Sequence, residues 1–116
     1  MEEAAELATD LLKALAAKNR LMILWQLTEG RKSVGELANR LGLRDASVSQ
    51  HLALLRREDL VRPRREAQKI YYSLSGIEVR RIIEVLYEIY YASTEGELVQ
   101  GEVEQNRQAT SKVSGS

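Results

Sequence analysis

The clearest pattern of apolar and polar positions along the chain lies in residues 33–57. In its first half, apolar residues recur at helical spacing from Val34 to Leu41, and Ser33 with Glu36 forms the capping-box pattern that starts helices. Gly42 follows, a residue that ends helices readily because it adopts positive φ at little cost. Helical spacing then resumes, so the stretch predicts two short helices joined by a tight turn.

The second of these helices, residues 45–57, has two different faces. Val48, Leu52 and Leu55 form a narrow apolar stripe, whereas the opposite side is small and polar and ends in an arginine. Such a face is compact enough for the DNA major groove and can hydrogen-bond to base edges, as in a helix-turn-helix. An ordinary helical hairpin with a solvated outer face is the alternative from this stretch alone. We expect Asp45 to cap the helix.

Helical spacing also extends over residues 3–17, 20–30 and 76–93, with Asn19 as the expected cap of the second segment. The first segment has a wide apolar stripe, which either the chain's own core or a second subunit explains. The last is apolar over more of its circumference than one side of a small domain can bury, which favours a symmetric dimer. The predicted interface residues are Leu7, Leu11, Ile82, Leu86, Ile89 and Tyr90.

After residue 57 the apolar spacing changes from a helical to a strand pattern. Residues 60–64 and 69–74 are short and enriched in Val, Ile and Tyr, which predicts two strands joined by a four-residue loop. Pro63 cannot donate a hydrogen bond to a sheet, so we expect the first strand to lie at an edge or to turn the Pro63 nitrogen away from its partner strand. We interpret the cationic tip of this ribbon as a contact for the DNA backbone. The cationic residues predicted on or near it are Arg62, Arg64, Arg65 and Lys69.

The predicted elements are four helices, two strands and a last helix. This is a mainly α fold with a small β-ribbon (α+β), and its order is that of a winged helix-turn-helix. At 116 residues the chain suits one domain, which we expect at residues 1–94. Residues 95–116 are polar and interrupted by glycine, and they predict a flexible tail.

Charge is segregated along the chain, although the net charge is zero. Residues 40–72 carry eight Arg or Lys against four acids, whereas residues 1–10 and 95–104 carry acids and no base. A phosphate-binding surface would have this distribution, although a solvated basic face would have it too.

Composition excludes several kinds of site. The chain has no cysteine and one histidine, which excludes disulfides, thiolate metal sites and any site that needs two histidines. It also lacks a glycine-rich phosphate loop, so we expect neither an enzyme nor a bound cofactor. No apolar run approaches the ~18 residues of a membrane span, and we expect a soluble, cytoplasmic protein without membrane contact.

The predicted DNA contacts come from the second hairpin helix and from the ribbon. Hydrogen bonds to base edges or phosphates are expected from Ser49 and Gln50, with Arg44 and Ser47 beside them. His51 lies between core and surface and suits a structural or phosphate hydrogen bond better than a ligand role. Backbone contacts are expected from Arg56, Arg57, Arg64, Arg65, Gln68 and Lys69.

The chain resembles the ArsR-type bacterial winged-helix repressors over about residues 11–92. The matching segments are residues 13–24, 33–37, 48–52, 54–57, 60–61 and 69–74. The wing pattern R-x-A-Q-x-[IV]-x-Y-x-L, here residues 65–74, is that of the nodulation-repressor and thiol-redox-regulator branch. The resemblance implies a homodimer that binds double-stranded DNA at a pseudo-palindromic operator and represses transcription, and many members release DNA when an inducer binds.

Two departures from the family bear on regulation. Thiol-switch relatives pair a cysteine near position 33 with one near position 91, where this chain has Ser33 and Tyr91. Metal-sensing relatives carry cysteines after position 33 or histidines along the last helix, and this chain has neither. Any effector is therefore of another, unknown small-molecule kind, or there is none. A winged helix used only for protein contacts is the alternative function, although its wing would not need this cationic density.

Overall fold

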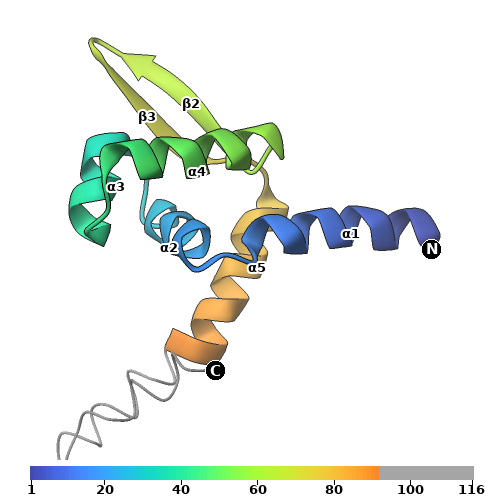
Figure 1. Cartoon of the computed structure of the whole chain (residues 1–116). Helices are drawn as coiled ribbons and strands as arrows, with labels where there is room; N and C mark the ends of the chain where they lie inside the picture. Colours follow the sequence, from blue (N-terminus) through green and yellow to red (C-terminus); the bar gives the residue numbers. More distant parts are fainter. Residues whose placement is uncertain (92–116) are drawn as a thin grey trace, which may run out of the picture. The chain divides into compact units, whose positions relative to one another are not determined.

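The computed structural model describes residues 1–91, and those residues have the predicted mainly α fold with a small sheet (Figure 1). The chain divides into two compact units, Met1–Ile83 and a second that begins at Glu84. The expected tail at residues 95–116 lies outside the described residues. In chain order the elements are α1 (Glu2–Leu15), α2 (Lys18–Leu27), β1 (Lys32–Ser33), α3 (Val34–Leu41), α4 (Asp45–Arg57), β2 (Val61–Glu66), β3 (Lys69–Leu74), α5 (Ile77–Leu86) and a π-helical turn, Tyr87–Tyr91.

The start and end of α3 confirm the pattern expected of its sequence. The Ser33 hydroxyl accepts a hydrogen bond from the Glu36 backbone N–H at 3.2 Å, and the Glu36 carboxylate accepts one from the Ser33 backbone N–H at 2.9 Å. This second bond is the main reason that the pKa of the Glu36 carboxyl lies below its ordinary value. Gly42 ends the helix in the left-handed conformation, with φ of 67°.

Two expected helix caps are wrong. Arg44 is the N-cap residue of α4 and makes no side-chain cap, so Asp45 is the first helical residue, where its charge favours the helix dipole. Helix α2 begins after Ala17, which places Asn19 inside its first turn. Across this short connection Arg20 donates to the carbonyl oxygen of Ala14 at 2.7 Å and so satisfies one of the acceptors at the end of α1.

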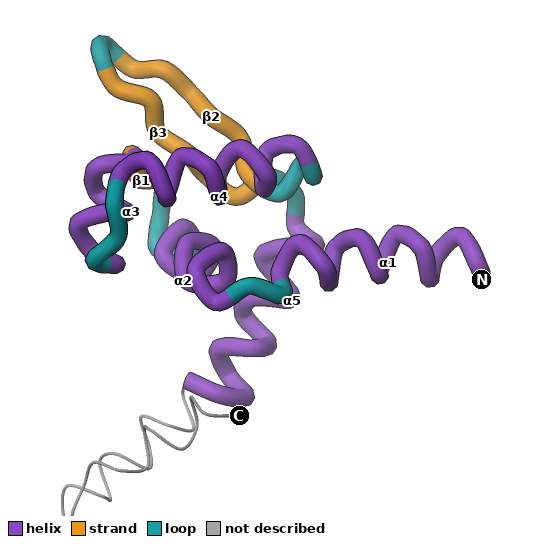
Figure 2. The backbone as a smooth tube through the Cα atoms, in the orientation of Figure 1, coloured by secondary structure: helices purple, strands orange, loops and turns teal. Residues whose placement is uncertain are grey.

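The sheet has three antiparallel strands in the order β1-β3-β2, one more than the ribbon predicted (Figure 2). β1 has only two residues, which is too short to show an alternating pattern. β2 runs to Glu66, which pairs with Lys69, so the expected four-residue loop is a two-residue turn whose first residue, Ala67, has φ of 58°. β2 is an edge strand, as the position of Pro63 predicted.

The first unit is built around a core to which α1, α2, α3, α4, β2 and the part of α5 up to Ile83 contribute. The predicted inner stripe of α4 is fully buried there, as Val48, Leu52 and Leu55 have no exposed surface. The other fully buried side chains are Ile23, Leu24, Leu27, Leu37, Val79 and Ile83. None of the helices in residues 1–91 is long and apolar enough to cross a membrane.

Within the expected helix over residues 76–93, α5 ends at Leu86 and the five residues after it form the π-helical turn, while residues 92 and 93 lie outside the described residues. The predicted domain end at residue 94 lies among residues that the structure does not describe.

Replacing Ser33 with alanine removes the side-chain acceptor of the capping box. We expect Ser33→Ala to lower the free energy of unfolding by about 1 kcal/mol, measured by urea denaturation. Ser49→Ala is the matched control, because Ser49 is an exposed serine inside a helix and we expect its change to stay within about 0.5 kcal/mol. Equal effects of the two substitutions would contradict a stabilising cap.

Candidate nucleic-acid interface

The outward face of α4 is exposed and polar because the opposite face is held in the core. Ser49, Gln50, Arg56 and Arg57 are exposed, and Ser47 and His51 lie at the edge of that face, half-buried. Arg44 is exposed at the start of the helix, where its carbonyl oxygen accepts hydrogen bonds from the first turn. The predicted α4 residues therefore share one helix, and the most exposed of them share one side.

The ribbon of β2 and β3 carries its polar residues on two faces. Residues that pair directly across antiparallel strands point to the same face, and neighbours along a strand alternate. Arg64 pairs with Tyr71 and Arg65 pairs with Ile70, so the two arginines point to opposite faces. Both are exposed. Gln68 lies in the turn, and Lys69 follows it on the face of Arg64.

Arg62 lies elsewhere than predicted. It pairs with Ser73, far from the turn, and its guanidinium donates to the Ser75 hydroxyl at 3.2 Å. The prediction that Arg62 lies near the tip of the ribbon is therefore wrong, because the strand begins only one residue before it.

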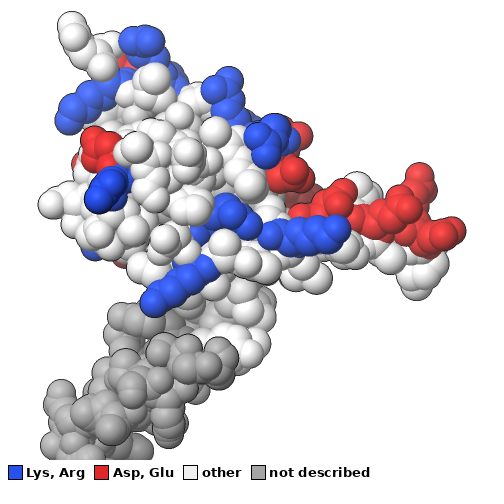
Figure 3. Space-filling view, in the orientation of Figure 1, with Lys and Arg blue, Asp and Glu red and all other residues white. Residues whose placement is uncertain are grey.

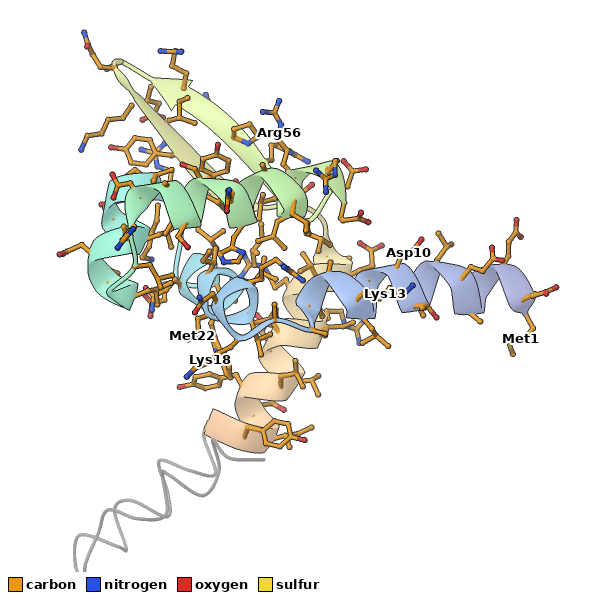
Figure 4. All side chains as sticks on the ribbon, viewed as in Figure 1. Met1, Asp10, Lys13, Lys18, Met22 and Arg56 are labelled. Carbon is orange, nitrogen blue, oxygen red and sulfur yellow. The ribbon has the colours of Figure 1, made fainter. Side chains whose placement is uncertain are left out.

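A hollow of about 320 Å³ lies between α4 and the sheet. It is lined by Ser49, Ala53, Arg56 and Arg57 from α4 and by Tyr72 from β3. Figure 4 shows the Arg56 side chain on the side of α4 toward the ribbon. The hollow thus combines two guanidinium groups, a serine hydroxyl and a tyrosine, a combination that suits a phosphate of a DNA strand.

Tyr72 is the residue of this surface that sequence reasoning missed. Its place in a run of two tyrosines indicated a strand and nothing more. Strand alternation was the signal available, since Tyr72 shares its face with Leu74 and Val61, which pack on the core. A tyrosine on that inner face, two residue pairs closer to the turn, lies toward α4.

The charges in the first unit are segregated on its surface (Figure 3). Lys and Arg side chains gather over the ribbon and α4, and Asp and Glu gather along α1. Glu66 is the one acid in the sequence of β2, the turn and β3. It forms an ion pair with Arg31, and the hydrogen bond from Arg31 is the main cause of the lowered pKa of its carboxyl.

The predicted interface residues differ in exposure. Leu7 is 71% exposed, while Leu11 and Ile82 are half-buried against the core of the first unit. In the second unit Leu86 is half-buried, and Ile89 and Tyr90 are more than half exposed. Sequence reasoning left out Leu12, Ile77 and Val85, which are equally exposed apolar residues.

Metal binding has no support in the part of the chain that the structure describes. Residues 1–91 contain no group of three or more His, Cys, Asp or Glu side chains that could hold a metal ion.

Comparison with known proteins places the chain among DNA-binding regulators. A sequence profile described as a helix-turn-helix domain matches residues 15–64. The chain is 49% identical over 90 residues to the transcriptional activator HlyU of Vibrio cholerae, covering 78% of this chain and 83% of that protein. It is 43% identical over 95 residues to a biofilm growth-associated repressor of Agrobacterium fabrum, covering 82% of this chain and 81% of that one.

Solved structures agree with these sequence matches. The structure of reduced HlyU from Vibrio cholerae superposes with a TM-score of 0.75, covering 78% of this chain and 95% of that one. A homodimeric winged helix-turn-helix DNA-binding domain from Mycobacterium bovis, described as a possible ArsR-family regulator, has a TM-score of 0.68 at 30% identity. That match covers 76% of this chain and 82% of the other.

Proposed function

This chain belongs to the ArsR family of winged-helix transcriptional regulators, and from that premise we propose that it is a homodimeric repressor of transcription. In this proposal α4 enters the DNA major groove, and the β2–β3 ribbon contacts the backbone beside it. Members of the family are regulators of transcription and not enzymes. The DNA partner is a pseudo-palindromic operator, because two subunits related by a two-fold axis present two copies of α4 to successive grooves.

The outer face of α4 is the strongest support for this function. Ser49 and Gln50 are exposed polar side chains on a helix whose other side is buried in the core. They point away from the core residues and are accessible to a ligand. Polar side chains of this length on an exposed helix can bond to base edges, and Gln pairs with adenine in two hydrogen bonds. Arg56 and Arg57, at the end of the same helix, suit phosphates.

The ribbon supports the same function through its charge. Arg64, Arg65 and Lys69 are exposed, and Gln68 forms the turn between the strands. Arg65 points to the face of the ribbon that lies toward α4. It is therefore placed to contact a phosphate of the DNA strand next to the recognition helix. Arg64 and Lys69 point to the other face and suit a backbone or minor-groove contact farther along.

Exposed apolar surface in both units supports dimerisation. In α1, Leu7 and Leu12 are 71% and 58% exposed, although leucine favours burial. In the second unit Val85 and Ile89 are half exposed. The Mycobacterium bovis relative is homodimeric, and a second copy of this chain is the simplest cover for these faces.

Regulation of this protein differs from thiol switching, because the chain has no cysteine. We infer that an effector, if the cell uses one, is a small molecule that acts without thiol or metal chemistry. If there is no effector, the cellular concentration of the protein determines the degree of repression.

Binding to duplex DNA tests the function directly. We expect the protein to retard an operator duplex recovered from genomic DNA, with an affinity that falls about a thousandfold between 50 and 200 mM salt. The double variant Gln50→Ala with Arg65→Ala should lose most of this binding, because it removes a base contact and a phosphate contact from each subunit. Electrophoretic mobility shift at several salt concentrations measures both effects.

Lys18→Ala is the matched control, since Lys18 is an exposed cation on the side of α2 away from α4 (Figure 4). The affinity of the Lys18→Ala variant for the operator should equal that of the wild type. If no genomic duplex is retarded at low salt, the proposed repressor function is wrong. The alternative function, a winged helix used only for protein contacts, would then be favoured.

Sedimentation equilibrium tests the dimer. We expect a dimer at micromolar concentration and a dissociation constant at least about tenfold higher for Leu7→Glu, because the exposed leucine loses its apolar partner in the other subunit. Glu6→Ala, at the exposed position beside it, should leave the constant unchanged. A wild-type monomer at micromolar concentration would remove dimerisation from the proposal.

A further inference from the structure

Arg31 links the ribbon to the chain that precedes it. It lies in the connection between α2 and β1, outside the ribbon, and its side chain is 48% exposed. The guanidinium lies 4.5 Å from the centre of the Tyr71 ring, in β3, and forms an ion pair with the Glu66 carboxylate, in β2, at 2.5 Å. One side chain therefore contacts both strands of the ribbon.

These contacts lie on one face of the ribbon. Tyr71 pairs with Arg64, and Glu66 pairs with Lys69, so by strand alternation all four side chains share the face away from Tyr72 and α4. Because β3 is the middle strand, Arg31 reaches across it from the β1 side to β2. The Glu66–Lys69 pair is the last before the turn, so the ion pair is made at the outer end of the ribbon.

The outer end of the ribbon has little else to hold it. β1 pairs with β3 only at Tyr71 and Tyr72, and β2 is an edge strand. At the inner end, Val61 is buried in the core, whereas residues 67–70 are exposed. A ribbon of two strands is marginally stable without further contacts, and its direction is easily changed.

Glu66 itself is unexpected in a ribbon that contacts phosphates. It is the one acid among residues 61–74, and a carboxylate near the DNA backbone repels it. The hydrogen bond from Arg31 lowers the pKa of this carboxyl, so Glu66 is ionised at neutral pH. An acid at this position is unfavourable for DNA binding by charge alone, which points to another role of its charge, in the ion pair with Arg31.

We propose that Arg31, Tyr71 and Glu66 form a clamp that holds the ribbon in the direction needed for DNA binding. Arg31 and Glu66 are thus positioning residues, which act through Arg65, Gln68 and Lys69 and do not themselves contact DNA. The clamp rests on the proposed function and adds to it the residues that orient the wing. An exposed ion pair adds little to overall stability, so the effect of the clamp falls on DNA affinity.

Replacement of Glu66 separates the clamp from simple charge repulsion, because the two predict opposite signs. Repulsion predicts that Glu66→Ala binds the operator more tightly, since an acid is lost from the phosphate-facing ribbon. The clamp predicts binding about threefold or more weaker, with an unchanged midpoint of urea denaturation. Glu58→Ala is the matched control: Glu58 is an exposed acid at the end of α4 with no ion pair among the described residues, and its loss should not weaken binding.

Arg31 is tested by a double-mutant cycle. If Arg31 acts through Glu66, Arg31→Ala, Glu66→Ala and the double variant lose affinity by similar factors, because each breaks the same clamp. If Arg31 contacts a phosphate directly, the double variant loses more than Glu66→Ala alone, and the clamp is wrong. Tyr71→Phe keeps the ring under the guanidinium and should retain wild-type affinity, whereas Tyr71→Ala should not.

Wild-type binding in the same titrations separates the two proposals. A wild-type protein that binds the operator, with Glu66→Ala binding equally well or more tightly, overturns the clamp and leaves the repressor function standing. A wild-type protein that binds no duplex overturns the repressor function, and the role of the clamp in DNA binding with it.

Discussion

The structure depends above all on the burial of one side of α4. Val48, Leu52 and Leu55 have no exposed surface, and each touches the core that α2 and the sheet complete. Because a helix is rigid, fixing three side chains on one face fixes the direction of every side chain on the other. The exposed positions of Ser49 and Gln50 are therefore a consequence of core packing, and the core supports the surface that we propose for DNA binding.

The ribbon depends on the same core but less completely. Val61 anchors its inner end, and Tyr72 extends the packing toward α4, where the two elements enclose the hollow that Arg56 lines. Beyond Tyr71 the core no longer contributes. Polar contacts replace it there, and Arg31 provides them through an ion pair and a stacked ring. Helix α4 is thus supported by hydrophobic packing, whereas the outer end of the ribbon is supported by electrostatic contacts.

The helices and the ribbon could be predicted because their signals are local. Helical spacing, the Ser33 capping box and Gly42 lie within a few residues of the structure that they specify. The same reasoning identified the exposed polar face of α4, since burying one stripe determines the other. The same reasoning could not fix the exact end of a helix. It predicted Asp45 as the N-cap of α4, whereas the N-cap is Arg44, one residue earlier.

Contacts between distant parts of the chain could not be predicted from local patterns. β1 has two residues and exists because β3 offers it an edge, so nothing in its own sequence marks it. Arg31 and Glu66 are 35 residues apart in the sequence. Without the register of the strands, Glu66 is predicted to be an acidic residue of the loop. The opposite directions of Arg64 and Arg65 likewise could not be predicted, because the expected strand ended at Arg64, whereas β2 continues to Glu66 and so includes Arg65.

We propose that α4 contacts bases while the ribbon contacts the DNA backbone, and a base-pair scan distinguishes these two roles. Wild type, Gln50→Ala and Arg65→Ala would each be titrated against operators in which every base pair of one half-site is replaced in turn. We expect Gln50→Ala to lose its preference at one base pair, worth about 1–3 kcal/mol, whereas Arg65→Ala should weaken binding to all operators by a similar factor. A Gln50→Ala profile that keeps every wild-type preference would contradict it.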